Sequence, residues 1–146
     1  MPVVEKELAL PGSQGSVWGL LNNPTELGKC IPGCEEVTVV SPSESRWKLR
    51  ISVGVIARRY DTRVKLISSK PMEELTYSVE SVDGGISAEF RIKLSPLTDS
   101  TSKLSFVANV EAGGSFQWMV NQVIKTQLER FVSQFAACVS AKMKQQ

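Results

Sequence analysis

The sequence contains no histidine among its 146 residues. Histidine is a common proton-transfer group near neutral pH and a common metal ligand, so its absence removes the usual catalytic dyads and most zinc sites. The three cysteines are too few to form a metal site by themselves. We therefore expect neither a metal nor a cofactor.

Long apolar runs are also missing. No window approaches the roughly 18 consecutive apolar residues that cross a bilayer. The first ten residues include Glu5, Lys6 and Glu7, where a secretory signal would have an apolar stretch. These absences indicate a cytoplasmic protein.

There is little excess charge of either sign. The net charge is +2 and the longest basic run is Arg58-Arg59, so we expect no nucleic-acid partner. An apolar fraction of 42% and a charged fraction of 22% are those of an ordinary globular protein. At this length we expect a single domain over residues 1–146.

The cysteines are few and odd in number, which argues against a disulfide framework. Cys30 and Cys34 bracket Ile31-Pro32-Gly33, and Cys138 lies far away in the last segment. We expect reduced thiols packed as small apolar groups. The alternative is a redox-sensitive pair of Cys30 and Cys34.

Two short helices are predicted between residues 13 and 33. Ser13 is suited to cap the first, and Asn23 to cap the second, whose first residue is Pro24. Glu26 stands where a capping-box acid reaches back to the start of the helix. We expect Pro32-Gly33 to end the second helix.

Most of the remaining chain alternates between apolar and polar residues. This period of two predicts an antiparallel sheet with one dry and one wet face. The predicted strands cover residues 3–10, 36–41, 46–55, 59–66, 74–80, 86–94 and 104–110. From Ser115 to Met143 the apolar spacing becomes helical without a Gly or Pro, so one long amphipathic helix is expected to cover the dry face. The order predicts an α+β fold.

Several segments resemble one known family. Residues 22–36 read N-N-P-T-E-L-G-K-C-I-P-G-C-E-E, and residues 53–56, 71–77 and 101–114 add further matching motifs. The chain thereby resembles the CoxG family of carbon monoxide dehydrogenase components, within the START-like (polyketide cyclase) superfamily. The resemblance implies a helix-grip fold, in which a curled antiparallel sheet of about seven strands wraps a long C-terminal helix and leaves a cavity between them.

That cavity is the predicted site for a hydrophobic small molecule such as a lipid or quinone. A pocket of roughly 300–1,000 Å³ is usual for such ligands. The predicted lining residues share the dry face of the sheet or the facing side of the helix. They are Trp47, Leu49, Ile51, Tyr60, Thr62, Val64, Tyr77, Val79, Phe90, Ile92, Phe106 and Ala108 from the sheet, and Phe116, Val120, Ile124, Leu128 and Phe131 from the helix. The alternative is that these side chains simply fill the core.

Few polar groups stand on the predicted dry face. Trp47, Tyr60, Thr62 and Tyr77 offer hydrogen bonds that would orient a quinone or phenolic head group, unless they bond to backbone or solvent instead. The glycine-containing segments 54–58, 83–85 and 113–114 are candidate entrance loops.

Three functions fit the sequence. The resemblance favours a noncatalytic carrier that assists a molybdenum-containing carbon monoxide dehydrogenase or related hydroxylase. The second is an interaction subunit without ligand, for which an exposed Trp118 would contact a partner or, with Arg58 and Arg59, make peripheral contact with the inner face of a membrane. The third is a cyclase-like enzyme that uses Tyr60 or Tyr77 for proton transfer.

Overall fold

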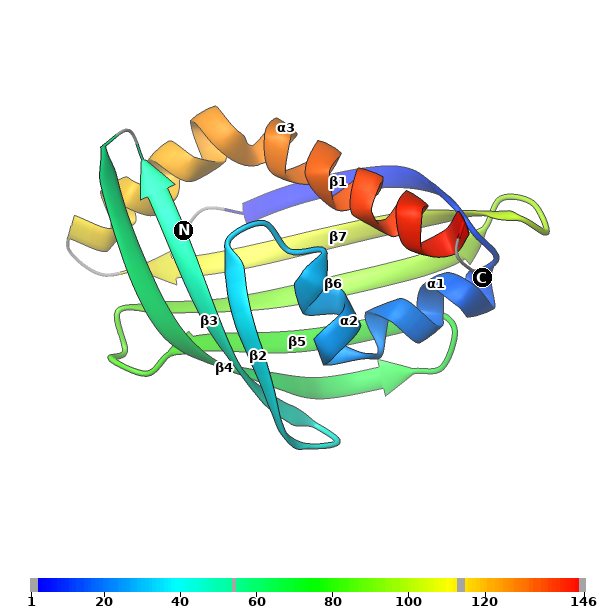
Figure 1. Cartoon of the computed structure of the whole chain (residues 1–146), viewed down its shortest axis with the longest axis horizontal. Helices are drawn as coiled ribbons and strands as arrows, with labels where there is room; N and C mark the ends of the chain where they lie inside the picture. Colours follow the sequence, from blue (N-terminus) through cyan, green and yellow to red (C-terminus); the bar gives the residue numbers. More distant parts are fainter. Residues whose placement is uncertain (1–2, 54, 113–114, 145–146) are drawn as a thin grey trace.

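Seven antiparallel strands form one curled sheet, and a 30-residue helix lies across its concave side (Figure 1). The structure is a computed structural model that describes residues 3–53, 55–112 and 115–144. The strands are β1 (Val3–Pro11), β2 (Cys34–Ser41), β3 (Glu44–Val53), β4 (Ile56–Lys70), β5 (Glu74–Ser81), β6 (Ile86–Pro96) and β7 (Thr101–Ala112). The helices are α1 (Gln14–Leu21), α2 (Pro24–Lys29) and α3 (Ser115–Lys144).

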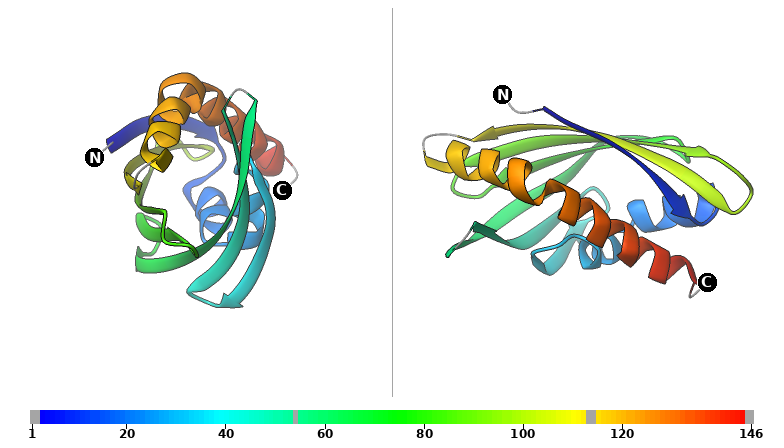
Figure 2. Two further views of the ribbon diagram at one scale, coloured as in Figure 1. Left: turned by 90° about the vertical axis from the view of Figure 1, so that its left-hand side faces the viewer. Right: turned by 90° about the horizontal axis from the view of Figure 1, so that it is seen from above.

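The strand order is β1-β7-β6-β5-β4-β3-β2, so the first two strands of the chain form the two edges. Curling brings these edges toward α3, which packs mainly against β1, β7, β3 and α1 (Figure 2). The predicted helix-grip fold is confirmed. β4 is much longer than its alternation indicated, because it continues to Lys70 through a register irregularity between Leu66 and Ser68.

Strand pairing places the predicted dry-face residues side by side. Phe90 of β6 lies opposite Tyr77 of β5 and Ala108 of β7, and Ile92 lies opposite Phe106. Residues that face each other across neighbouring strands point to the same side of a sheet. The predicted dry face is therefore the concave face of the observed sheet.

Both predicted helix caps are confirmed. The Ser13 hydroxyl accepts from the Ser16 amide, and the Asn23 side chain accepts from the Glu26 amide. However, α2 ends at Lys29 with Cys30 as its C-cap, three residues before Gly33. The Glu26 carboxylate pairs with Lys29 and with Lys142 of α3, so it bridges two helices instead of forming the predicted capping box.

The expectation of three reduced cysteines is wrong. Cys30 and Cys138 form a disulfide with an S–S distance of 2.08 Å and a Cα–Cα distance of 5.3 Å, across 108 residues of sequence. An odd count leaves one cysteine over but does not prevent the others from pairing. The end of α2 lies beside the last turns of α3, which brings the two residues together. Cys34 is the free thiol, and burial raises its pKa, so the alternative pair of Cys30 and Cys34 is also not formed.

Gly33 is required where the chain turns from α2 into β2. Its φ is +87°, and an added Cβ would lie 2.5 Å from the backbone oxygen of Arg50. The Arg50 amide donates to the Gly33 oxygen at 2.7 Å, so the two backbones are held close. Neither strand can move away without losing this hydrogen bond.

We expect Gly33→Ala to lower the free energy of unfolding by about 3 kcal/mol, because it combines a left-handed backbone with a clash. Gly84→Ala is the matched control. Gly84 also has a positive φ of +79°, but no atom lies within 4 Å of its added Cβ, so we expect a loss of about 1 kcal/mol. Urea denaturation of both variants measures the difference, and equal losses would contradict the clash.

Candidate functional site

The structure brings the predicted lining residues together on the concave face. β3 and β4 contribute the neighbours Trp47 and Thr62, and also Leu49 and Tyr60. Val64 of β4 lies opposite Val79 of β5. The rows formed by Tyr77, Phe90 and Ala108 and by Ile92 and Phe106 continue this surface across β5, β6 and β7. The surface therefore spans five neighbouring strands.

Burial along this surface changes from one end of the sheet to the other. The α1 end, at the right of Figure 1, contains α1 and the turns β4–β5 and β6–β7. The Trp118 end, at the left, contains the turns β3–β4 and β5–β6 and the start of α3. At the α1 end, Leu10, Leu75, Leu94 and Leu104 are at most 4% exposed. This end holds the dry core of the protein.

Toward the Trp118 end, the large apolar side chains of the same face are only half-buried. They include Leu49, Ile51, Val79, Phe90, Ile92 and Phe106. Tyr60, Thr62 and Ala108 are buried, so the surface is covered unevenly. Five of the six half-buried side chains pack against the core cluster; Ile51 is the exception. The concave face thus keeps apolar area that the protein itself does not cover.

Helix α3 shows the same change along its length. Val139 is fully buried and Phe135 is 8% exposed, whereas Val120, Ile124, Leu128 and Phe131 are half-buried. These residues follow one another at intervals of three or four, so they share one side of the helix. The side chain of Phe116 lies outside the described part of the chain.

Three of the four predicted polar contacts are used within the protein. The Trp47 indole donates to the Ser45 hydroxyl at 2.8 Å, and the Thr62 hydroxyl donates to the Trp47 oxygen at 3.0 Å. The Tyr77 hydroxyl donates to the Leu21 oxygen at 2.7 Å and so ties the sheet to α1. Among the described residues, every buried side-chain nitrogen or oxygen has a hydrogen-bond partner. No donor of Trp47, Thr62 or Tyr77 remains to orient a head group.

Burial raises the pKa of Tyr77 from 10.0 to about 12. Because the folded state holds this proton more tightly than the unfolded chain, its stabilising effect is complete below pH 10 and is lost between pH 10 and about 12. We expect the free energy of unfolding to fall across this range less steeply in Tyr77→Phe than in the wild type. Urea denaturation at a series of pH values measures this, and identical slopes would contradict a buried phenol.

Tyr60 lies nearer the Trp118 end. Burial raises the pKa of its phenol, the positive charge of Arg58 lowers it, and the negative charge of Asp83 raises it. Of the two tyrosines in the chain, Tyr60 is therefore the one with charged groups beside it.

The predicted entrance loops are described only in part. Gly54, Gly113 and Gly114 lie outside the described residues. In the β5–β6 turn, the Asp83 carboxylate accepts from the Gly85 amide at 3.0 Å and from the Ser81 hydroxyl at 2.7 Å. These bonds lower the pKa of Asp83 and give the turn a fixed conformation.

Trp118 is 54% exposed, as its predicted role in contacts requires. The sequence did not single out Val55, Ile56 and Val82, which are also exposed at the turns of the same end. Their common feature is a hydrophobic residue in a predicted turn, and that signal was available before the structure.

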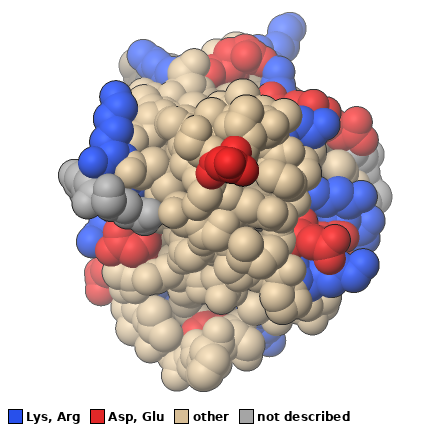
Figure 3. Space-filling model, turned by 90° about the vertical axis from the view of Figure 1, so that its right-hand side faces the viewer, with Lys and Arg blue, Asp and Glu red and all other residues tan. Residues whose placement is uncertain are grey.

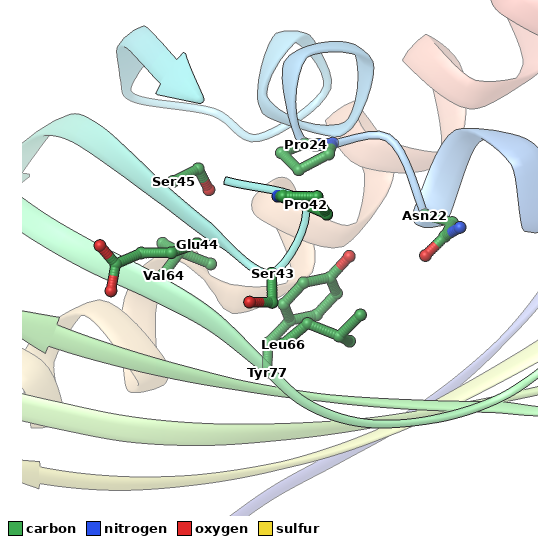
Figure 4. Close-up of a pocket in the computed structure, with 9 residues that line it drawn as sticks. All are labelled: Asn22, Pro24, Pro42, Ser43, Glu44, Ser45, Val64, Leu66 and Tyr77. Carbon is green, nitrogen blue, oxygen red and sulfur yellow. The ribbon is translucent and has the colours of Figure 1, made fainter. Parts of the chain in front are cut away.

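Two hollows among the described residues lie elsewhere. One, of about 10 Å³, has room for at most one water and lies beside the β2–β3 turn (Figure 4). It is lined by Asn22, Pro24, Pro42, Ser43, Glu44, Ser45, Val64, Leu66 and Tyr77. Figure 4 shows the Tyr77 ring beneath the turn that contains Pro42 and Ser43.

The second hollow, of about 440 Å³, is open to solvent at the α1 end. Its lining is Pro11, Gly12, Ser13, Ser16, Asp99, Ser100, Met143 and Lys144, which is largely polar. Figure 3 views this end, whose centre carries few charged side chains. Neither hollow is the predicted pocket between sheet and helix, which stays a prediction based on the half-buried side chains.

No three metal-binding side chains gather in the described part of the chain. Among the described helices, α3 included, none has the length and apolar character needed to span a bilayer.

Comparisons with known proteins agree with this architecture. A conserved protein from Geobacillus kaustophilus superposes with a TM-score of 0.84 at 23% identity, over 99% of this chain and 96% of that one. The Zhui aromatase/cyclase from Streptomyces sp. R1128 gives 0.69 at 13% identity, over 99% and 94%. A START superfamily protein from Mycobacterium smegmatis gives 0.69 at 12% identity, over 98% and 97%. These likenesses establish the START-like fold.

No curated protein matches the sequence. The family model for CoxG, a component of carbon monoxide dehydrogenase, in contrast matches residues 9–144, which include all three helices and all but the first residues of the sheet. By its sequence, and in agreement with its helix-grip architecture, this chain belongs to the CoxG family of carbon monoxide dehydrogenase components.

Proposed function

We propose that this protein is a noncatalytic carrier of a hydrophobic small molecule, such as a lipid or a quinone. The ligand lies between the concave face of the sheet and the N-terminal half of α3. The observation that carries the proposal is the change in burial along this face, from leucines at most 4% exposed at the α1 end to half-buried Ile51, Phe90 and Ile124 nearer the Trp118 end.

Partly uncovered apolar area is a source of binding free energy. An isoprenoid or acyl tail that buried on the order of 300 Å² here would gain about 7 kcal/mol before the costs of ordering. The donors of Trp47, Thr62 and Tyr77 are already engaged. Recognition therefore rests on apolar contact, with Tyr60 as the nearest phenol for a polar head group.

The family name provides the context for this carrier. It points to association with a carbon monoxide dehydrogenase. We propose a role as an accessory protein of such a molybdenum hydroxylase, in the cytoplasm. Any membrane contact would be peripheral, at the inner face, through Trp118 with Arg58 and Arg59.

A cyclase-like enzyme is a weaker candidate. One structural neighbour is an aromatase/cyclase, but its 13% identity supports the fold alone. Tyr77 holds its proton up to about pH 12 and donates it to Leu21, so it is unsuited to proton transfer near neutral pH. Catalysis would then rest on Tyr60, and turnover that survived Tyr60→Phe would remove this mechanism.

A protein-interaction subunit without ligand is favoured by one observation. Trp118, Val55 and Val82 are 54%, 103% and 45% exposed at one end of the molecule. Exposed apolar groups that cluster in this way often mark contact surfaces. Trp118→Glu separates the two functions, because it should weaken docking to a partner without changing ligand uptake.

The direct test is mass spectrometry of organic extracts from the natively purified protein. A stoichiometric lipid or quinone supports the carrier and identifies its ligand. The measurement is repeated after incubation with membrane lipids and quinones, so that loss during purification is accounted for. Empty extracts in both cases would overturn the carrier in favour of the interaction subunit.

A further inference from the structure

Helix α3 is attached to the rest of the protein at two places. Near its middle, the Gln127 side chain donates to the Ser52 oxygen at 2.7 Å, and Glu129 forms an ion pair with Lys6 of β1. Toward its C-terminal end, Cys138 is bonded to Cys30 of α2, and Lys142 pairs with Glu26. The N-terminal half, which faces the uncovered apolar area, has the weaker of these attachments.

The disulfide is the strongest bond of the second attachment. Its neighbour, the Glu26–Lys142 ion pair, is solvent-exposed on the Glu26 side, and such pairs contribute little. Phe135 and Val139 add apolar packing at 8% and 0% exposure. If the S–S bond were broken, this packing and one ion pair would hold the C-terminal half of α3.

The two sulfur-bearing residues differ in accessibility. Cys30 is 3% exposed, whereas Cys138 is half-buried on the outer side of the α2–α3 contact. A thiolate must approach one sulfur along the S–S axis. The accessible sulfur is that of Cys138. Cys34 is a poor internal attacker, because burial raises its pKa and keeps it protonated.

We infer that the Cys30–Cys138 bond is a redox-controlled link, which dithiols reduce in the folded protein and whose reduction loosens α3 from α2. A thiolate of the dithiol attacks Sγ of Cys138, the S–S bond breaks, and Cys30 leaves as a thiolate that takes up a proton. The second thiol of the dithiol then releases Cys138 and closes its own disulfide. Two electrons and two protons pass from the dithiol to the protein.

Loosening should be local. The sheet is held by its own hydrogen bonds and by the core at the α1 end, which does not depend on the link. Helix α3 is the element that gains motion, because its last turns lose their covalent partner. If the proposed function holds, this motion also speeds the exchange of ligand at the concave face.

The test is hydrogen exchange of the native protein before and after treatment with dithiothreitol, with thiols counted in each state. We expect one thiol before and three after, without denaturant. The amides of the C-terminal half of α3 should then exchange at least tenfold faster, while those of β5 and β6 stay within about twofold. Cys138→Ser should show the fast rates without reductant, and Cys34→Ser should behave like the wild type.

Three outcomes would overturn the inference. The first is a bond that dithiothreitol reduces only in denaturant. The second is equal acceleration of all amides, which would make the bond a global staple. The third is loss of the response in Cys34→Ser, which would make Cys34 the attacking group. Uptake of a short-chain ubiquinone is measured separately in both redox states, so its absence in both would count against the carrier and not against the link.

Discussion

Replacing Ile124 by aspartate is expected to abolish uptake of a hydrophobic ligand while the protein stays folded. Ile124 is half-buried on the side of α3 that continues into buried Phe135 and Val139, so it faces the concave surface. In the ligand-free protein the new carboxylate remains hydrated. A bound apolar tail would strip that water, and an unpaired charge without water costs several kcal/mol.

We expect the Kd for a short-chain ubiquinone to rise at least about 100-fold, which corresponds to roughly 3 kcal/mol. Quenching of tryptophan fluorescence reports the binding, since Trp47 lies on the concave face. Thr126→Asp is the matched control, because Thr126 is an exposed residue of the same helix, two positions further on and so on nearly the opposite side. It adds the same charge and should bind like the wild type.

An Ile124→Asp protein that bound the quinone as tightly as the wild type would place the ligand elsewhere. The 440 Å³ hollow at the α1 end would then be the next place to examine. Circular dichroism spectra of both variants should match that of the wild type, which shows that the loss of binding does not come from unfolding.

The second large effect is expected from Cys138→Ser. The disulfide closes a loop of 108 residues, and cross-links of this span restrict the unfolded chain strongly. We expect the variant to lose about 2–4 kcal/mol of unfolding free energy in the absence of reductant. Urea denaturation followed by circular dichroism measures the change.

Two comparisons isolate the bond from the cysteine side chains. The wild type in dithiothreitol should match Cys138→Ser, because both lack the cross-link. Cys34→Ser should stay close to the wild type, since Cys34 is the free and half-buried thiol. An unchanged urea midpoint in Cys138→Ser would show that the bond does not restrict the unfolded chain.

The strands, the caps and the long helix were readable from local patterns. Alternation assigned Tyr77, Phe90 and Phe106 to one face, and pairing in the sheet confirmed it. Ser13 and Asn23 act on amides three residues away, so their roles needed no knowledge of the rest of the chain. Patterns of this kind depend on neighbours within one turn or one strand, which the sequence contains directly.

Partners distant in the chain were decided by the tertiary structure. Cys30 meets Cys138 across 108 residues, Glu26 meets Lys142, and the Tyr77 hydroxyl meets the Leu21 oxygen. Composition and spacing describe which groups are present, but these contacts depend on how α2 and α3 lie against the curled sheet. The same holds for the unequal burial of the concave face, because a residue's exposure is set by whatever folds over it.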